Sequence, residues 1–159
     1  MSASANAAPH RELTITRIVD APRELVWKMW TEPKHLAQWF GPRHFTNPVC
    51  EVDLRVGGTL HVVMRSPQGT DHAMKGIFRE VVAPQRLAFT NNAYDTDGRK
   101  LLEGFTTVTL VEVGGKTRMI LETSATGLVD IAPQMLAGME AGWTQSLEKL
   151  DELVAEIRK

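Results

Sequence analysis

Hydrophobic positions along the chain recur with two different periods, and the change of period separates helices from strands. Residues 13–16 alternate between apolar and threonine side chains, which predicts a first strand. Helical spacing then runs over residues 25–30, and Pro22 and Pro33 suit the first turn and the end of one short helix. We expect a second short helix that ends at the glycine-proline pair 41–42.

From Val49 onward the apolar residues alternate with polar ones, as in strands that bury one face. The predicted strands cover residues 50–55, 60–65, 74–82, 87–91, 103–113 and 116–124. Short turns separate them, including a tight hairpin at Gly57-Gly58 and a looser loop over 95–98. Consecutive hairpins favour antiparallel pairing, so we expect one antiparallel sheet of about seven strands in all.

The C-terminal region carries apolar residues spaced by three or four, which predicts one long helix. These residues are Leu136, Met139, Trp143, Leu147, Leu150, Val154 and Ile157. With Asp130 as its N-cap, this helix would run for ~25 residues, about 37 Å. The other three tryptophans lie far away in the sequence, between residues 27 and 39, and we expect them to meet Trp143 in one core. The predicted class is therefore α+β, with a curved antiparallel sheet closed by the long helix.

Length and composition fit one globular domain. The 159 residues are 43% hydrophobic and 23% charged, enough to build a core without disulfides or metals. We expect a disordered tail over residues 1–10 and a single domain over 11–159. A net charge of −1 without a Lys/Arg run argues against nucleic acid, and no apolar run suggests a membrane partner. Cys50 is the sole cysteine, which fits a reducing compartment, and we expect a cytoplasmic protein.

Several short motifs resemble one protein family. They are Ala-Pro-x-Glu-x-Val-Trp at 21–27, Trp-Thr-x-Pro at 30–33, Trp-Phe-Gly-Pro at 39–42, Asp-x-Arg-x-Gly-Gly at 53–58 and Gly-x-Phe-x-Glu-Val at 76–81. With the order of the predicted elements, they resemble the START-related (SRPBCC) superfamily, which includes the birch-pollen allergen and lipid-transfer domains. Within it, they are similar to the AHSA-type branch, named for the activator of the ninety-kilodalton heat-shock chaperone's ATPase. The likeness runs from Glu12 to Leu153.

This resemblance implies the helix-grip fold, in which the curved sheet wraps around the long C-terminal helix and two short helices follow the first strand. It also favours a cavity between sheet and helix that binds a small hydrophobic ligand. One alternative is a cyclase- or dehydratase-like enzyme that uses the same cavity, as some members of the superfamily do. Another is a chaperone-associated interaction module. Fold likeness alone does not transfer chemistry, and we rank ligand binding first.

The first half of the predicted C-terminal helix has the features of a cavity wall. Met135, Met139 and Trp143 are large, and methionine adapts to varied shapes. Gly138 and Gly142 disfavour the helix, which suggests that space is left beside them or that something approaches closely. The predicted cavity, occupied by a lipid-like or aromatic molecule, is lined by Trp39, Phe40, Met64, Met74, Phe78, Phe89, Met135, Met139 and Trp143.

No sequence motif for a nucleophile elbow, a phosphate loop or a dinucleotide site is present. We therefore assign no catalytic residue, metal or cofactor. If the cavity were catalytic, the polar candidates would be His44, Asp53, Glu103 and Thr123. A free sheet edge would also allow a homodimer, although nothing in the sequence selects one.

Overall fold

The computed structural model describes residues 9–159, which form one eight-stranded antiparallel sheet and four helices. The strands are β1 (His10–Val19), β2 (Thr46–Val52), β3 (Thr59–Arg65), β4 (Asp71–Val82), β5 (Arg86–Thr90), β6 (Asn92–Tyr94), β7 (Lys100–Val113) and β8 (Lys116–Gly127). The helices are α1 (Arg23–Thr31), α2 (Pro33–Trp39), α3 (Ala132–Ala137) and α4 (Met139–Ile157). The predicted tail over 1–10 lies mostly outside the described residues, while β1 already begins at His10.

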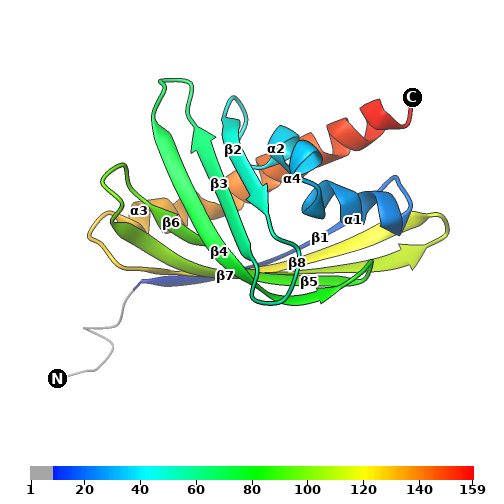
Figure 1. The fold of residues 1–159 in the computed structure, drawn as a ribbon, viewed down its shortest axis with the longest axis horizontal. Coiled ribbons are helices and arrows are strands. Elements are labelled where there is room, and N and C mark those ends of the chain that lie inside the picture. Colours follow the sequence, from blue (N-terminus) through cyan, green and yellow to red (C-terminus); the bar gives the residue numbers. More distant parts are fainter. Residues whose placement is uncertain (1–8) are drawn as a thin grey trace.

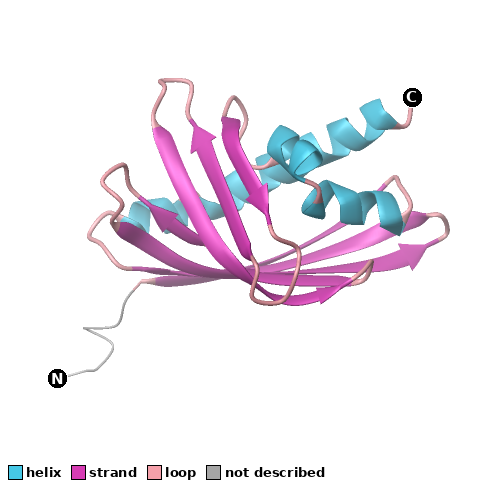
Figure 2. Cartoon of the chain, in the orientation of Figure 1, coloured by secondary structure: helices cyan, strands magenta, loops and turns pink. Residues whose placement is uncertain are grey.

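The strands are ordered β1-β8-β7-β5-β4-β3-β2, and the short β6 pairs with β4 and β7 beside this path. Figure 1 shows that the sheet bends. Strands β2, β3 and β4 stand at a steep angle to β5, β7 and β8. The helices lie within this bend, and α4 crosses the sheet along its length (Figure 2). The α+β helix-grip architecture predicted from the sequence is confirmed.

Alternation along the strands buries one face of the sheet against the helices. The buried strand residues include Leu60, Val62, Met74, Phe78, Phe89, Val108, Leu110, Met119 and Leu121. From α4, Leu147, Leu150 and Val154 are almost completely buried in the same cluster. The second half of α4 is therefore fixed on the sheet by ordinary core packing.

Trp30 lies where the N-terminal helices, the sheet and α4 meet. Its ring stacks on Trp143 at 6.3 Å between centroids and meets the edge of Trp39 at 4.7 Å. The Trp30 ring nitrogen donates to the sulfur of Met119 on β8 at 3.3 Å. The expectation that the separated tryptophans share one core is confirmed. Their ring contacts connect α1 and α2 to α4.

The C-terminal helix is not continuous as predicted, because it breaks at Gly138 into α3 and α4. Glycine is a poor helix former, and the Gly138 N–H is shared between the carbonyls of Gln134 and Met135. The start of α3 packs closely against the end of β8, where a Cβ on Gly127 would lie 2.2 Å from the Cβ of Ala132. A side chain at position 127 would therefore clash with the start of α3.

Two further details differ from the sequence-based expectation. The connection between β2 and β3 spans residues 53–58 instead of a tight turn at Gly57-Gly58. The chain turns early because the Arg55 N–H bonds to the Asp53 carbonyl, and both glycines then pair with Phe78 on β4. Strand β6 was not expected, since three residues carry too little periodicity to be recognised. Between residues 9 and 159 there is no helix that combines the length and apolar character of a membrane span.

Replacing Leu150 with alanine tests how firmly the second half of α4 is held. Leu150 is fully buried, so Leu150→Ala should lower the free energy of unfolding by about 3 kcal/mol. Ile157→Ala, on the same helix at a side chain that is 41% exposed, should cost about 0.5 kcal/mol or less. Urea denaturation followed by tryptophan fluorescence measures both. Equal effects of the two substitutions would contradict this account of the core.

Candidate functional site

A cavity of about 520 Å³ lies between the concave face of the sheet, α3 and the first half of α4. Its deeper wall is formed by buried or partly buried residues: Phe40, Met74, Leu101, Thr123, Ala125, Leu136, Trp143 and Ser146. More accessible residues line the outer part, including Phe45, His72, Tyr94, Gln134, Met135 and Met139. The hollow is thus an apolar pocket with a mixed rim, the usual form of a small-molecule site.

The two halves of α4 explain why space remains here. The second half buries its leucines in the core, whereas the first half presents Met139, Gly142 and Trp143 to the cavity. A Cβ on Gly142 would find only the Pro42 ring at 4.0 Å, so the glycine leaves open volume beside the helix. Trp143 closes the inner end through its contacts with Trp30 and Phe40.

The loop that follows α2 forms one side of the cavity through Phe40, Gly41, Pro42 and Phe45. Gly41 has a φ of 93°, a conformation that side chains disfavour, and a Cβ there would lie 3.0 Å from the sulfur of Met64. The Asn47 side-chain amide donates to the carbonyls of Ala37 and Phe40, both at 2.8 Å. Backbone shape and these two hydrogen bonds therefore hold the loop at the cavity.

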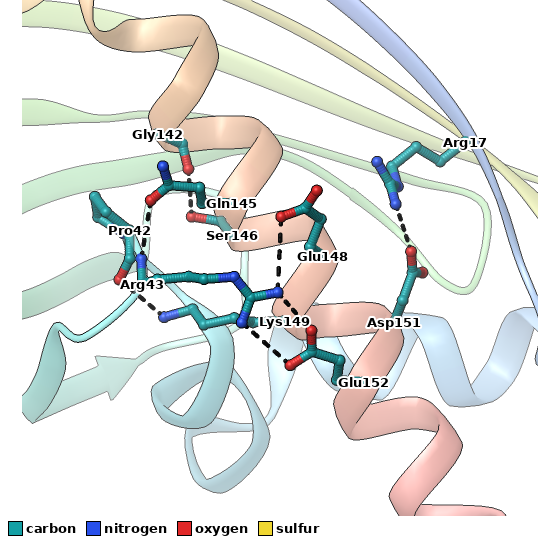
Figure 3. Close-up of polar contacts among 10 residues, drawn as sticks. All are labelled: Arg17, Pro42, Arg43, Gly142, Gln145, Ser146, Glu148, Lys149, Asp151 and Glu152. Carbon is teal, nitrogen blue, oxygen red and sulfur yellow. Dashed lines mark hydrogen bonds and ion pairs between the residues drawn. The ribbon is translucent and has the colours of Figure 1, made fainter.

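The same loop is attached to α4 by polar contacts (Figure 3). The Arg43 N–H donates to the Gln145 side-chain oxygen at 3.1 Å, and the Lys149 ammonium donates to the Pro42 carbonyl at 3.1 Å. The Arg43 guanidinium forms a bidentate pair with Glu152 and approaches Glu148 at 3.6 Å. These contacts connect the loop to α4 between Gln145 and Glu152 (Figure 3).

We call these contacts between the loop (residues 42–43) and α4 the clamp. Three of its side chains, Arg43, Lys149 and Glu152, have shifted pKa values. The hydrogen bond from Arg43 lowers the pKa of the Glu152 carboxyl, and the same bond raises the pKa of Arg43. Burial lowers the pKa of the Lys149 ammonium, and the neighbouring positive charge of Arg43 lowers it further. At neutral pH the Arg43–Glu152 pair is therefore fully charged, and it is exposed to screening by salt.

A short chain of hydrogen bonds reaches the cavity wall from the sheet. The Thr106 hydroxyl on β7 donates to the Asn91 side-chain oxygen at 2.9 Å. It also lies 2.8 Å from the hydroxyl of Thr123 on β8, directly opposite in the strand register. Thr123 and Asn91 line the cavity, whereas Thr106 lies behind them and is fully buried.

The structure brings six of the nine predicted cavity residues together. These are Phe40, Met64, Met74, Met135, Met139 and Trp143, from the α2–β2 loop, β3, β4, α3 and α4. The other three lie in the core away from the cavity lining. Trp39 donates its ring N–H to the Met29 carbonyl at 2.9 Å, and Phe78 and Phe89 pack against each other at 6.1 Å.

Of the four polar candidates for catalysis, only Thr123 lines the cavity. His44, Asp53 and Glu103 are exposed and lie elsewhere. Asp53 pairs with Arg55 at 2.9 Å, and His44 occupies a turn position with a φ of 73°. No group of three or more His, Cys, Asp or Glu side chains able to hold a metal occurs within residues 9–159.

Sequence reasoning missed several lining residues that alternation could have supplied. Ala125 shares a strand face with Thr123, and His72 shares one with Met74. Tyr94 and Leu101 could not be found in this way, because β6 and the register shift beside it were not predicted.

Comparison with known proteins places this geometry in a family. Residues 20–155 match the family model described as Activator of Hsp90 ATPase homolog 1-like protein. A solved structure from Nitrosomonas europaea is 28% identical, with a TM-score of 0.76 over 92% of this chain and 96% of that one. One from Chromobacterium violaceum is 30% identical, with a TM-score of 0.76 over 90% and 96%. The AHSA1 protein from Silicibacter pomeroyi is 28% identical, with a TM-score of 0.75 over 91% and 98%. No curated protein matches the chain.

The clamp between the loop and α4 should open in acid. Because Arg43 lowers the pKa of Glu152, the contribution of this pair to stability is present above about pH 4.3, the usual value for glutamate, and is lost as the pH falls through the lowered pKa. Backbone amide signals of the loop in an NMR titration should follow this step. Glu152→Gln should remove the step and modestly increase hydrogen exchange in the loop at neutral pH.

Glu156→Gln provides the matched control, since Glu156 lies one turn further along α4 and pairs with Lys159. This variant should keep the acid step of the loop. Persistence of the step in Glu152→Gln would show that another group holds the loop.

Proposed function

The chain belongs to the Activator of Hsp90 ATPase homolog 1-like family, and from that premise and its cavity we propose that it binds a small, largely apolar molecule between the sheet and α4. The observation that carries the proposal is a 520 Å³ hollow lined mainly by aromatic, aliphatic and methionine side chains. Sites for small ligands typically measure about 300–1,000 Å³ and combine an apolar lining with few polar groups. The volume suits a compact lipid-like or aromatic molecule.

Affinity would come mainly from removing apolar surface from water, at about 25 cal/mol per Å² before the cost of ordering the ligand. Met64, Met74, Met135 and Met139 supply flexible contact around the hollow. Methionine side chains adapt to different shapes, so this lining favours a ligand class over one rigid molecule. Phe40 and Trp143 meet edge to face at 5.8 Å and provide a firmer aromatic end.

Binding explains the site better than catalysis does. A general acid or base must reach the reacting atoms, yet the exposed carboxylates Asp53 and Glu103 do not line the cavity. Thr123 does line it, but its hydroxyl lies against Thr106 and has no base beside it among the described residues. The cyclase- or dehydratase-like alternative would have to rely on His72 and Tyr94 at the accessible rim.

Filling the cavity should weaken binding at least tenfold while the fold is kept. Ala125 is buried on β8 and lines the cavity, so Ala125→Phe places a large apolar side chain in the space that the ligand would occupy. Ala141→Phe is the control, because Ala141 is exposed on α4 and lies outside the cavity. Native mass spectrometry of the purified proteins, followed by calorimetric titration with a panel of fatty alcohols and aromatic compounds, compares the variants.

We expect wild type and Ala141→Phe to bind members of the panel alike, and Ala125→Phe to lose at least tenfold in affinity. Unchanged circular dichroism would confirm that Ala125→Phe is folded. If wild type retains no molecule and binds none of the panel, the proposed function is wrong. Undiminished binding by folded Ala125→Phe would place the ligand elsewhere.

A further inference from the structure

We infer that the ligand of this cavity is a neutral molecule whose buried end carries a hydroxyl group, and that this hydroxyl donates its proton to the Thr123 oxygen. The inference rests on the proposed function and adds the chemical class of the ligand to it. Three observations support it: the lining holds no aspartate, glutamate, lysine or arginine, the buried hydroxyl groups already donate their protons to protein acceptors, and the Asn91 amide beside Thr123 is a donor that a hydroxyl can accept from.

The lining contains no aspartate, glutamate, lysine or arginine among the residues that the structure describes. Transferring an ion from water to this apolar lining without a charged partner costs far more free energy than one hydrogen bond contributes. Cations that contact the lining residues have other partners: Lys75 lies over the Tyr94 ring at 5.3 Å, and Lys149 donates to the Pro42 carbonyl at 3.1 Å. Arg11 donates to the Leu136 carbonyl at 2.8 Å, and Arg43 pairs with Glu152. A carboxylate or ammonium at the buried end is therefore disfavoured.

The number of hydroxyl protons determines whether the inner wall can donate or accept a hydrogen bond. A threonine hydroxyl has one proton and two lone pairs. Thr106 donates its proton to the Asn91 side-chain oxygen at 2.9 Å. The 2.8 Å contact between Thr106 and Thr123 must then be donated by Thr123. The Thr123 hydroxyl thus has only acceptor capacity left for a molecule in the cavity.

Ser146 on α4 has the same restriction. Its hydroxyl donates to the Gly142 carbonyl one turn earlier at 3.0 Å, and it also lines the cavity. The two buried hydroxyl groups of the lining, Thr123 and Ser146, are therefore both acceptors toward a ligand. Burying such an acceptor under an apolar or acceptor-only ligand leaves it unpaired, which is unfavourable.

The remaining polar groups make a hydroxyl the best match among donors. The Asn91 side chain lines the same wall and keeps its amide nitrogen as a donor. A hydroxyl can accept a hydrogen bond from a donor of this kind while it donates to Thr123, whereas an ether or a ketone can only accept. His72 and Gln134 are exposed at the rim, where they can hydrogen-bond to water. They therefore contribute little to the choice of ligand.

Matched ligands test this directly. We would titrate the full-length protein calorimetrically with decanol, its methyl ether and decanoate, and with β-naphthol, its methyl ether and β-naphthoate. In at least one series the alcohol or phenol should bind about tenfold tighter than its ether, and the carboxylate should bind more weakly still. Equal binding of alcohol and ether, or tighter binding of the carboxylate, would overturn the inference and leave the proposed function standing. Failure of every compound would refute both.

Three variants then assign the preference to the threonine pair. Thr123→Val removes the acceptor and should bring the alcohol and ether affinities together, while Thr123→Ser should keep the difference. Thr106→Val changes a residue that does not line the cavity, yet it frees the Thr123 proton to turn toward the ligand. In this variant the preference for the alcohol should shrink or reverse. An unchanged preference in folded Thr106→Val and Thr123→Val would show that the threonine pair does not select the ligand.

Discussion

The cavity depends on one packing constraint, which is that α4 is held tightly at one half and held away from the sheet at the other. Leu147 and Leu150 are fully buried in the core, so the second half of the helix cannot move independently of the sheet. In the first half, Trp143 rests on Trp30 and Phe40 and acts as a spacer at the inner end. The bent sheet supplies the opposite wall, and the volume between them follows from these two contacts.

Much of this fold could be predicted from the sequence because its signals are local. Alternation marked the long strands, and the apolar stripe marked the residues by which α4 packs. The break at Gly138 was harder to predict, since a glycine lowers helix propensity without forcing an end. Gly127 also leaves no room for a side chain beside Ala132, a close contact between β8 and α3 that only the folded chain reveals. The six-residue connection before β3 likewise depends on pairing with the distant Phe78.

The sequence predicted only part of the candidate site, because the position of a residue along the bent sheet depends on distant contacts. A strand pattern tells which face a residue occupies, but it does not tell where along the bent sheet that residue falls. Phe78 and Phe89 share the concave face with Met74, yet they lie beneath the tryptophans instead of the hollow. Tyr94 lines the cavity from β6, a strand of three residues with a shifted register. A strand this short has no hydrophobic period from which it could be predicted.

The distribution of charge completes the argument for a binding site. Ion pairs such as Arg43–Glu152 and Arg65–Asp71 lie on the exposed surface, where hydration makes them inexpensive and also weak. The cavity lining, in contrast, contains no aspartate, glutamate, lysine or arginine among the described residues, so a neutral ligand would meet no buried charge there. Unfilled apolar space forfeits dispersion contacts that a packed core would gain. A neutral ligand that filled the hollow would restore those contacts and stabilise the folded state by mass action, so binding and stability would be coupled through the same methionine and tryptophan side chains.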